Sequence, residues 1–348
     1  MYFLVPGDLA TRTGGYLYDR RVVDGLRARG WTVTVRPLGG GFPNPSPAEI
    51  AHARETLGRL PDGSTAVIDG LALGAMPEVV TPEAGRLRLV GLVHHPLAAE
   101  TGLDPATARG LGERERAALA ATSRCVTTSH QTARDLAGYG VPDGRIGVVP
   151  PGTDPAPLAG RHRSRTLQIL CVATLTPRKG HRVLLRALAP LRQRRWRLTC
   201  VGSLERDPAT AGSVTAECRR LGLAGRVTFR GELDDEALAA CYRRADLFVL
   251  ASFHEGYGMA LAEALARGLP VVSTRAGAIP GPVPRAAGCL VRPGDIGALS
   301  RALDRVLSDP VLRERLAAGA RRARRALPTW GTSAQRFAAE LLLVDEAG

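Results

Sequence analysis

The chain of 348 residues contains almost no lysine, because Lys179 is the single lysine among its 47 basic residues and the others are all arginines. Aromatic residues make up only 4% of the sequence, and no stretch interleaves arginine with aromatic rings, which disfavours binding of single-stranded nucleic acid. No apolar run approaches the ~20 residues that a membrane-spanning helix needs. The N-terminal MYFLVPGD has no basic segment before its apolar residues, so we expect a first strand rather than a signal peptide.

The cysteines also lack the spacing of a metal or disulfide motif. No C-x-x-C pair occurs, and most cysteines lie in apolar stretches such as ILCVA and LTCVG. We therefore expect reduced core residues in a cytoplasmic protein, rather than disulfides or zinc ligands. The six cysteines are at positions 125, 171, 200, 218, 241 and 289.

The basic charge is confined to the second half of the chain. The formal net charge is +14, but residues 1–160 hold 16 arginines and 16 acidic residues, so the whole excess lies in residues 161–348. This half could bind a polyanion such as nucleic acid, or it could belong to an enzyme that holds a diphosphate there. The run RRARR at 321–325 lies in a helical pattern and is interpreted as a solvated helix face.

Short β-rich runs alternate with helical patterns along the chain, which predicts α/β domains with parallel sheets. The pattern stops at the Pro/Gly-rich segment 150–165, interpreted as a linker, and then restarts. We expect two doubly wound domains, 1–155 and 165–328, that face a cleft, with a separate amphipathic helix in 329–348; ligands bind beyond the carboxyl ends of strands in such sheets. The strands expected are 2–6, 32–38, 66–70, 87–93, 125–129 and 145–150, then 167–175, 197–203, 226–232, 246–252 and 269–277.

The lone lysine lies in TLTPRKGH, residues 174–181, between an expected strand and the start of an expected helix. An ammonium group is compact, whereas a guanidinium is a wide planar fork, and a compact cation beside Gly180 suits a phosphate held by backbone amides. The alternative is the chance survival of one lysine codon in an arginine-rich composition. The segment is not a Walker loop, because G-x-x-x-x-G-K-[ST] is absent.

A second loop carries two glutamates around a Gly-x-Gly, in VLASFHEGYGMALAEALARG. At 100° per residue, the eight residues from Glu255 to Glu263 leave the two side chains about 80° apart, so both could face the cleft. A carboxylate suits the vicinal hydroxyls of a ribose or a sugar, and the helix start between the two acids presents amides to a phosphate. The alternative is that both acids only complement the helix dipole.

Further glycines and histidines follow expected strands. Gly231 could pass close to a flat ring, and Gly14-Gly15 opens the first helix, where an anion could bind. His94 and His95 end a strand, where either could polarise a hydroxyl or a leaving group, or could be structural. G-x-G-x-x-G, H-E-x-x-H and Asp-x-Asp are all absent, which disfavours a nicotinamide enzyme, a zinc protease and a metal–diphosphate clamp.

Together these motifs resemble those of the retaining glycosyltransferases of family 4, which have the GT-B fold of two Rossmann-like domains. The strongest similarity is the Glu-x7-Glu element, here Glu255 to Glu263, followed by TRAGAIP; PRKGHRVLLRAL is similar to the diphosphate-binding segment, and VVPPGTD to the end of the first domain. The resemblance implies an N-terminal acceptor domain, a C-terminal nucleotide-sugar domain, and a last helix that returns to the first domain.

The resemblance also implies residue roles. Lys179 would bind the donor diphosphate, Glu263 the ribose hydroxyls, and Glu255 with the amides of 256–260 the donor sugar and phosphate. Gly231 would lie by the base, Gly15 by the diphosphate from the opposite domain, and His95, rather than His94, near the sugar and acceptor. The catalytic set is then His95, Lys179 and Glu255, and the donor-binding set is Gly15, Arg178, Lys179, Gly231, Glu255, Gly256, Tyr257, Gly258, Met259, Ala260 and Glu263.

One position departs from the family pattern, since many members have arginine where this chain has Thr174, and whether Arg178 compensates is open. The implied reaction moves a sugar from a UDP- or GDP-sugar to an acceptor hydroxyl with retention, and with no metal or other cofactor. The first half has a net charge of zero, which disfavours docking to an anionic membrane, so a small-molecule or natural-product acceptor is expected. The alternatives are a regulatory protein that binds a nucleotide sugar without turnover and a nucleic-acid-binding protein.

Overall fold

A computed structural model of the chain describes residues 1–160 and 165–345. The chain divides into two compact units: unit 1 is Met1–Gly152 with Pro328–Gly348, and unit 2 is Thr153–Leu327. Residues 161–164 of the expected linker and 346–348 of the expected last helix lie outside the described residues. Every helix in the described part of the chain is too short or too polar to cross a membrane.

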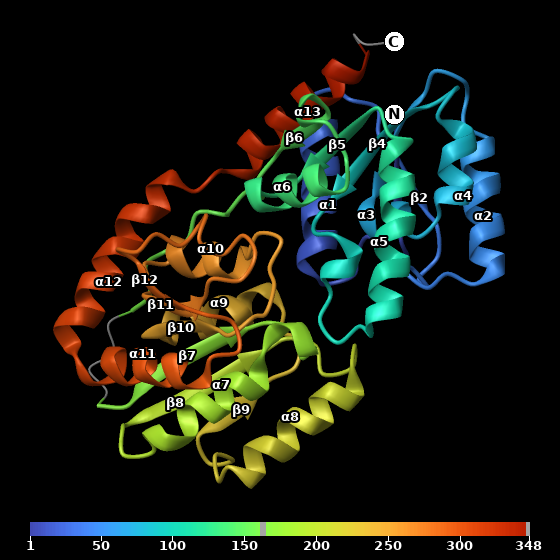
Figure 1. The fold of residues 1–348 in the computed structure, drawn as a ribbon. Helices are drawn as coiled ribbons and strands as arrows, with labels where there is room; N and C mark the ends of the chain where they lie inside the picture. Colours follow the sequence, from blue (N-terminus) through green and yellow to red (C-terminus); the bar gives the residue numbers. More distant parts are fainter. Residues whose placement is uncertain (161–164, 346–348) are drawn as a thin grey trace. The chain divides into compact units, whose positions relative to one another are not determined.

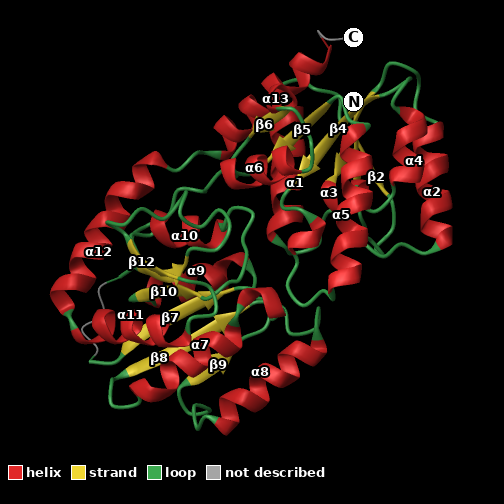
Figure 2. Ribbon diagram, viewed as in Figure 1, coloured by secondary structure: helices red, strands yellow, loops and turns green. Residues whose placement is uncertain are grey.

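Unit 1 is built on a six-stranded parallel sheet with the strand order β2-β1-β3-β4-β5-β6. β1, β3, β4 and β5 are short runs that are mostly buried, as expected for a parallel sheet that helices cover on each side (Figure 2), whereas the edge strand β2 is partly exposed. The strands are β1 (Tyr2–Val5), β2 (Thr34–Pro37), β3 (Thr65–Asp69), β4 (Arg88–Val93), β5 (Arg124–Thr127) and β6 (Ile146–Val148).

Alternate residues of these strands point into two separate apolar cores. Phe3 belongs to the core on one face of the sheet and Leu4 to the core on the other. The last helix contributes Phe337 and Leu341 to the same core as Phe3, so it packs beside α1 on unit 1, as expected (Figure 1). The helices are α1 (Gly14–Arg27), α2 (Pro47–Gly58), α3 (Gly70–Leu73), α4 (Pro77–Val80), α5 (Pro105–Ala120), α6 (His130–Gly138) and α13 (Trp330–Asp345).

Unit 2 has a second six-stranded parallel sheet, with the order β12-β11-β10-β7-β8-β9. The order reverses between β10 and β7, as it does at the switch point of nucleotide-binding Rossmann sheets. The expected α/β class with two parallel sheets is therefore confirmed. The strands are β7 (Leu167–Val172), β8 (Trp196–Val201), β9 (Val227–Phe229), β10 (Leu247–Leu250), β11 (Val271–Thr274) and β12 (Gly288–Val291).

One observed strand, β12, was not predicted from the sequence pattern. It has four residues, begins with a glycine and is only partly buried beyond it, and its apolar run, Cys289 to Val291, is short. Each of the expected strands overlaps an observed strand. The helices of unit 2 are α7 (His181–Leu188), α8 (Pro208–Arg220), α9 (Asp235–Arg244), α10 (Met259–Ala266), α11 (Ile296–Ser308) and α12 (Pro310–Ala323).

Candidate functional site

The two loops singled out in the second half of the sequence meet at the point where the strand order of unit 2 reverses. β7 and β10 are neighbours there, although about 80 residues separate them along the chain. The lysine loop follows β7 and the Glu255 loop follows β10, so both leave the same edge of the sheet. A crevice beyond the strand ends at such a reversal is where doubly wound sheets bind ligands.

The lysine loop packs tightly against the start of the Glu255 loop. A short 3-10 turn, η4 (Pro177–Lys179), ends at Gly180, whose φ of +66° is a conformation that favours glycine. A Cβ at Gly180 would lie 2.1 Å from the carbonyl oxygen of Ala251, so a side chain there would push the two loops apart. The amide of Phe253 donates to the carbonyl of Arg178 at 2.8 Å and ties the loops together.

The lysine pairs with the first of the two glutamates. Lys179 Nζ lies 2.7 Å from Glu255 Oε1, which also accepts a hydrogen bond from Ser252 Oγ at 2.6 Å. Arg178 donates to the carbonyl of His254 at 2.9 Å and lies 3.8 Å from Glu255 Oε2. Burial alone would raise the pKa of Glu255, but the charges of Lys179 and Arg178 and the two hydrogen bonds lower it overall. Glu255 is therefore an ionised, acceptor-only group, and both cations of the loop are directed toward it.

The second glutamate belongs to a different hydrogen-bond network. Glu263 Oε2 accepts from the hydroxyl of Tyr242, a fully buried residue of α9, at 2.9 Å. The Arg267 guanidinium lies 4.3 Å from the centre of the Tyr242 ring. Burial raises the pKa of Glu263, against the opposing effects of the Tyr242 hydrogen bond and the Arg267 charge. The two glutamates thus differ: one is held charged by cations, and the other lies in a less polar setting.

The structure contradicts the helical spacing that was expected between the two glutamates. α10 begins at Met259, so Glu255 lies in the loop before the helix and not on it, and counting 100° per residue between the two acids has no meaning. Glu255 is positioned instead by the Lys179 and Ser252 contacts and by the amide of Ala278, which donates to its carbonyl oxygen at 2.9 Å.

Two helices begin at this edge of the sheet without a side-chain cap. α7 is preceded by Gly180 and α10 by Gly258, both with positive φ, and neither of these N-cap residues provides a side-chain cap. The first turn of a helix has amide donors without intrahelical partners and a positive dipole end, so it attracts anions. Four of the predicted donor-binding residues, which surround Gly258, are partly exposed: Gly256, Tyr257, Met259 and Ala260.

Gly231 lies farther along the same sheet. It follows β9, which is separated from β7 by β8, and its φ is +65°. Within the described part of the chain, no atom lies within 4 Å of the position that a Cβ would take, so a planar group could approach the backbone there. Gly231 is therefore placed at the sheet edge of the site but apart from the Lys179–Glu255 pair.

In unit 1 the two predicted histidines have different surroundings. His94 Nε2 lies 3.1 Å from Asp19 and 3.2 Å from Asp69, both buried carboxylates. Burial would lower the pKa of His94, but the two carboxylates outweigh it and raise the pKa well above its usual value. The His94 ring also lies 3.5 Å from the position of a Cβ on Gly15. His95 Nε2 lies 3.8 Å from Glu100, and its side chain is 25% exposed.

Comparison with known proteins decides the family. Residues 18–157 match the family described as Glycosyltransferase Family 4, and residues 166–309 match glycosyl transferases group 1. Over 324 residues the chain is 31% identical to the MMP alpha-(1->4)-mannosyltransferase of Mycolicibacterium hassiacum, with 88% of this chain and 76% of the relative covered. The chain belongs to glycosyltransferase family 4.

Other relatives of this family 4 chain are longer than the part they share with it. The D-inositol 3-phosphate glycosyltransferase of Streptomyces avermitilis is 30% identical over 262 residues, which cover 70% of this chain and 56% of the relative. The corresponding protein of Thermomonospora curvata is also 30% identical, and 64% of its length is covered. The chain therefore spans between 56% and 64% of the length of these two curated relatives.

Solved structures show that the family 4 chain has the GT-B fold. Sucrose-phosphate synthase from Thermosynechococcus elongatus has a TM-score of 0.85 at 22% identity, and the alignment covers 100% of this chain and 99% of that one. Anabaena Alr3699/HepE, solved with UDP and glucose, has a TM-score of 0.77 at 18% identity over 98% of each chain. At these identities the likeness concerns the fold alone.

Four polar residues of the family 4 chain were missed by the sequence analysis, because none of them belongs to a recognisable motif. Asp19 lies in a helix and Asp69 ends a strand, and neither spacing indicates that both meet His94. Ser252 and Tyr242, which hold the two glutamates, carry no spacing signal either.

A buried carboxyl also supports the loop that carries the histidines, and it predicts a pH effect. Glu115 of α5 is 1% exposed, and its Oε2 accepts from the amide of Leu97 at 2.9 Å, two residues after His95. Burial raises the pKa of Glu115 to about 7, against the lowering effects of hydrogen bonds from Leu97 and Tyr139. The pKa of Glu115 is higher in the folded state than in the unfolded chain, where it is near 4.5. The protonated carboxyl therefore stabilises the fold fully below pH 4.5, and this contribution is lost as the pH rises through 7.

Glu115→Gln keeps an oxygen acceptor for Leu97 but carries no proton to lose. Relative to the wild type, we expect its thermal midpoint to rise between pH 5 and pH 8. The corresponding gain in the free energy of unfolding is on the order of 3 kcal/mol, from about 1.4 kcal/mol for each unit of difference in pKa. Glu113→Gln, at an exposed position of the same helix, should follow the wild type at every pH. Parallel midpoint-against-pH curves for Glu115→Gln and the wild type would contradict the assignment.

Proposed function

We propose that the chain is a retaining glycosyltransferase that moves a sugar from a UDP- or GDP-sugar to a hydroxyl of a small-molecule or natural-product acceptor. The observation that carries the proposal is the Lys179–Glu255 pair, which lies at the strand reversal of unit 2 between two helix starts that lack side-chain caps. This arrangement combines a full positive charge with amide donors at one edge of the sheet. It suits a diphosphate that gains negative charge as it leaves.

The ion pair does not prevent Lys179 from binding the donor. An ammonium group has three donor hydrogens, so it can bind Glu255 and a phosphate oxygen at the same time. Glu255, held ionised, then accepts hydrogen bonds from hydroxyls of the donor sugar. Glu263 serves the ribose hydroxyls, and Gly231 leaves space for the base. In this proposal the leaving phosphate helps to deprotonate the acceptor, no protein nucleophile takes part, and added divalent metal is not required.

The acceptor assignment rests on the relatives. The relatives from Streptomyces avermitilis and Thermomonospora curvata are named for D-inositol 3-phosphate, a small phosphorylated polyol. We propose an acceptor of this size class. The test is a thermal-shift panel of UDP, GDP and their sugars, followed by transfer assays in EDTA with polyol and sugar-phosphate acceptors. Stabilisation by a nucleotide without turnover would favour a regulatory protein, and a salt-dependent interaction with nucleic acid alone would favour nucleic-acid binding.

The two histidines give a sharper prediction, because their surroundings differ. We expect His95→Ala to lower kcat strongly with little change in the thermal midpoint, since a side chain that is 25% exposed supports little of the core. His94→Ala removes the cation between Asp19 and Asp69 and should destabilise the fold by about 3–5 kcal/mol. Assays of kcat and thermal unfolding on both variants check this. Full turnover in His95→Ala would remove it from the proposed site.

A further inference from the structure

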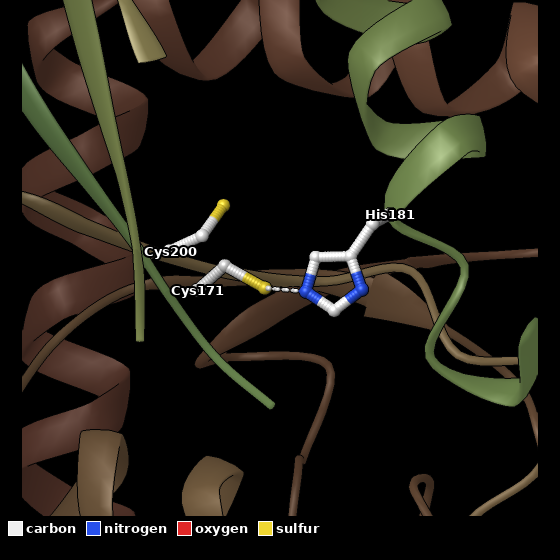
Figure 3. Close-up of side chains that lie close together, drawn as sticks. All are labelled: Cys171, His181 and Cys200. Atoms are coloured by element: carbon white, nitrogen blue, oxygen red, sulfur yellow. Dashed lines mark hydrogen bonds between the residues drawn. The ribbon is translucent and has the colours of Figure 1, made fainter. Parts of the chain in front are cut away.

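Two thiols and an imidazole of unit 2 converge inside the protein. Cys171 of β7 and His181, the first residue of α7, point toward each other, and Cys200 of β8 lies beside them (Figure 3). Cys171 and Cys200 are direct partners in the β7–β8 register, so both side chains leave the same face of the sheet. One ligand atom from each residue lies within 4.8 Å of the other two, and Cys171 Sγ is 3.8 Å from His181 Nε2.

The cluster is closed to solvent, and its imidazole is poorly satisfied. The three residues are between 1% and 3% exposed. Among the described residues His181 Nδ1 has no hydrogen-bond partner, and Nε2 has the weak contact with the Cys171 thiol. A buried polar ring normally finds strong partners, because leaving one unsatisfied costs free energy. Coordination of a cation by Nε2 would supply the strong interaction that the hydrogen bonds of this ring do not.

The donor set defines the class of ion. Two sulfurs are soft ligands and an imidazole nitrogen suits zinc and copper, so this donor set selects Zn²⁺ or Cu⁺ over Mg²⁺, Ca²⁺ or Mn²⁺. Two thiolates would neutralise Zn²⁺ and leave no net charge in the interior, which favours zinc at a buried site. Among the described residues, no fourth cysteine, histidine or carboxylate joins the group, so zinc would complete its tetrahedron with a non-protein ligand, whereas Cu⁺ would need none.

We propose that Cys171, Cys200 and His181 bind one thiophilic cation, with Zn²⁺ favoured. Each thiol loses its proton on binding, so one cation replaces two protons, and no redox change takes place. The cation would tie β7 and β8 to the start of α7. Because His181 follows Lys179 and Gly180 directly, the metal would also fix the turn that carries the lysine. The link from this turn to donor binding rests on the proposed function, whereas metal binding itself does not.

The test measures metal binding independently of any sugar transfer. Because the site is buried, reduced metal-free protein is refolded with one equivalent of Zn²⁺, Cu⁺ or Co²⁺, the last as a spectroscopic probe. We expect one bound ion per chain, a thermal midpoint higher by several degrees than that of the metal-free protein, and a thiolate-to-Co²⁺ charge-transfer band. Competition between Zn²⁺ and Cu⁺, followed by metal analysis, identifies the preferred ion.

Matched variants locate the ligands. Cys171→Ser, Cys200→Ser and His181→Asn should each lose the Co²⁺ band and the metal-dependent stabilisation. Cys289→Ser, which changes a partly exposed cysteine of β12 outside the cluster, should keep both. If the ligand variants fail to fold, the wild type still decides, because the intensity of the Co²⁺ band reports how many thiolates coordinate. A wild type without that band, or variants that bind metal as well as Cys289→Ser does, would overturn the proposal.

Discussion

Replacing Lys179 by alanine is expected to lower glycosyl transfer by about 10²–10³-fold, the usual loss when one preorganised donor to a developing charge is removed. Nζ lies at the edge of the sheet beside two uncapped helix starts, and the sequence has no other lysine to replace it. The effect should fall mainly on kcat, because the charge on the diphosphate grows as the bond to the sugar breaks. Initial rates over a range of donor concentrations measure it.

The same substitution also removes the cation closest to a buried carboxylate, and this second effect must be separated from the first. Glu255 is 6% exposed, and Arg178, at 3.8 Å, remains as its charged partner. Breaking a buried pair costs about 3–5 kcal/mol, so the thermal midpoint should fall as well. In the double variant Lys179→Ala with Glu255→Gln, the buried carboxylate that lost its nearest cation is replaced by a neutral amide. We expect stability to recover there, while transfer stays below that of Glu255→Gln alone, which keeps Lys179.

Two further variants complete the test of Lys179. Arg182→Ala changes an exposed cation at the second position of α7 and should leave kcat and stability near the wild type. Lys179→Arg keeps the charge but replaces a compact ammonium by a planar fork. If the lone lysine survives by codon chance, Lys179→Arg should be fully active; we expect most of the transfer to be lost instead. Normal transfer in Lys179→Ala, at normal donor affinity, would refute the role of this residue.

The sequence was informative about the fold because the signals of a parallel α/β protein are local. The runs around Phe3, Ile68 and Val249 are apolar on both faces, and each is bounded by polar or glycine-rich turns, so strand and helix order follow from the pattern. β12 was missed because it is a partly buried edge strand whose apolar run, Cys289 to Val291, is shorter than the runs that indicate a buried strand.

The site was only partly predictable, because its contacts are not local. That Lys179 and Glu255 both follow strands could be read from the sequence, but the direct ion pair depends on β7 and β10 being neighbours. The cage of two carboxylates around His94 depends in the same way on how α1, β3 and β4 pack. The Cys171–His181–Cys200 cluster was interpreted as ordinary core, since no spacing marks residues that only strand pairing brings together.

The largest effect on donor affinity is expected at Glu263. A carboxylate that accepts hydrogen bonds from ribose hydroxyls contributes about 1.5–3 kcal/mol per bond, so Glu263→Gln should weaken binding of the nucleoside diphosphate about 10- to 100-fold. The amide that replaces the carboxylate has nearly the same volume and keeps one oxygen for the Tyr242 hydroxyl, so the fold should stay intact. Titration calorimetry with UDP or GDP, whichever stabilises the wild type, gives the dissociation constants.

Tyr242→Phe is the matched control, because it removes the hydroxyl that holds Glu263 but leaves the carboxylate in place. Tyr242→Phe should lower the free energy of unfolding by about 1 kcal/mol and change the nucleotide affinity much less than Glu263→Gln does. The 2′-deoxy nucleotide then identifies the contact. The wild type and Tyr242→Phe should bind it less tightly than the ribonucleotide, whereas Glu263→Gln should hardly distinguish the two. If Glu263→Gln still binds the 2′-deoxy nucleotide much less tightly than the ribonucleotide, the ribose hydroxyl contacts another residue. A side chain that does not bind the hydroxyl loses no affinity when the hydroxyl is removed.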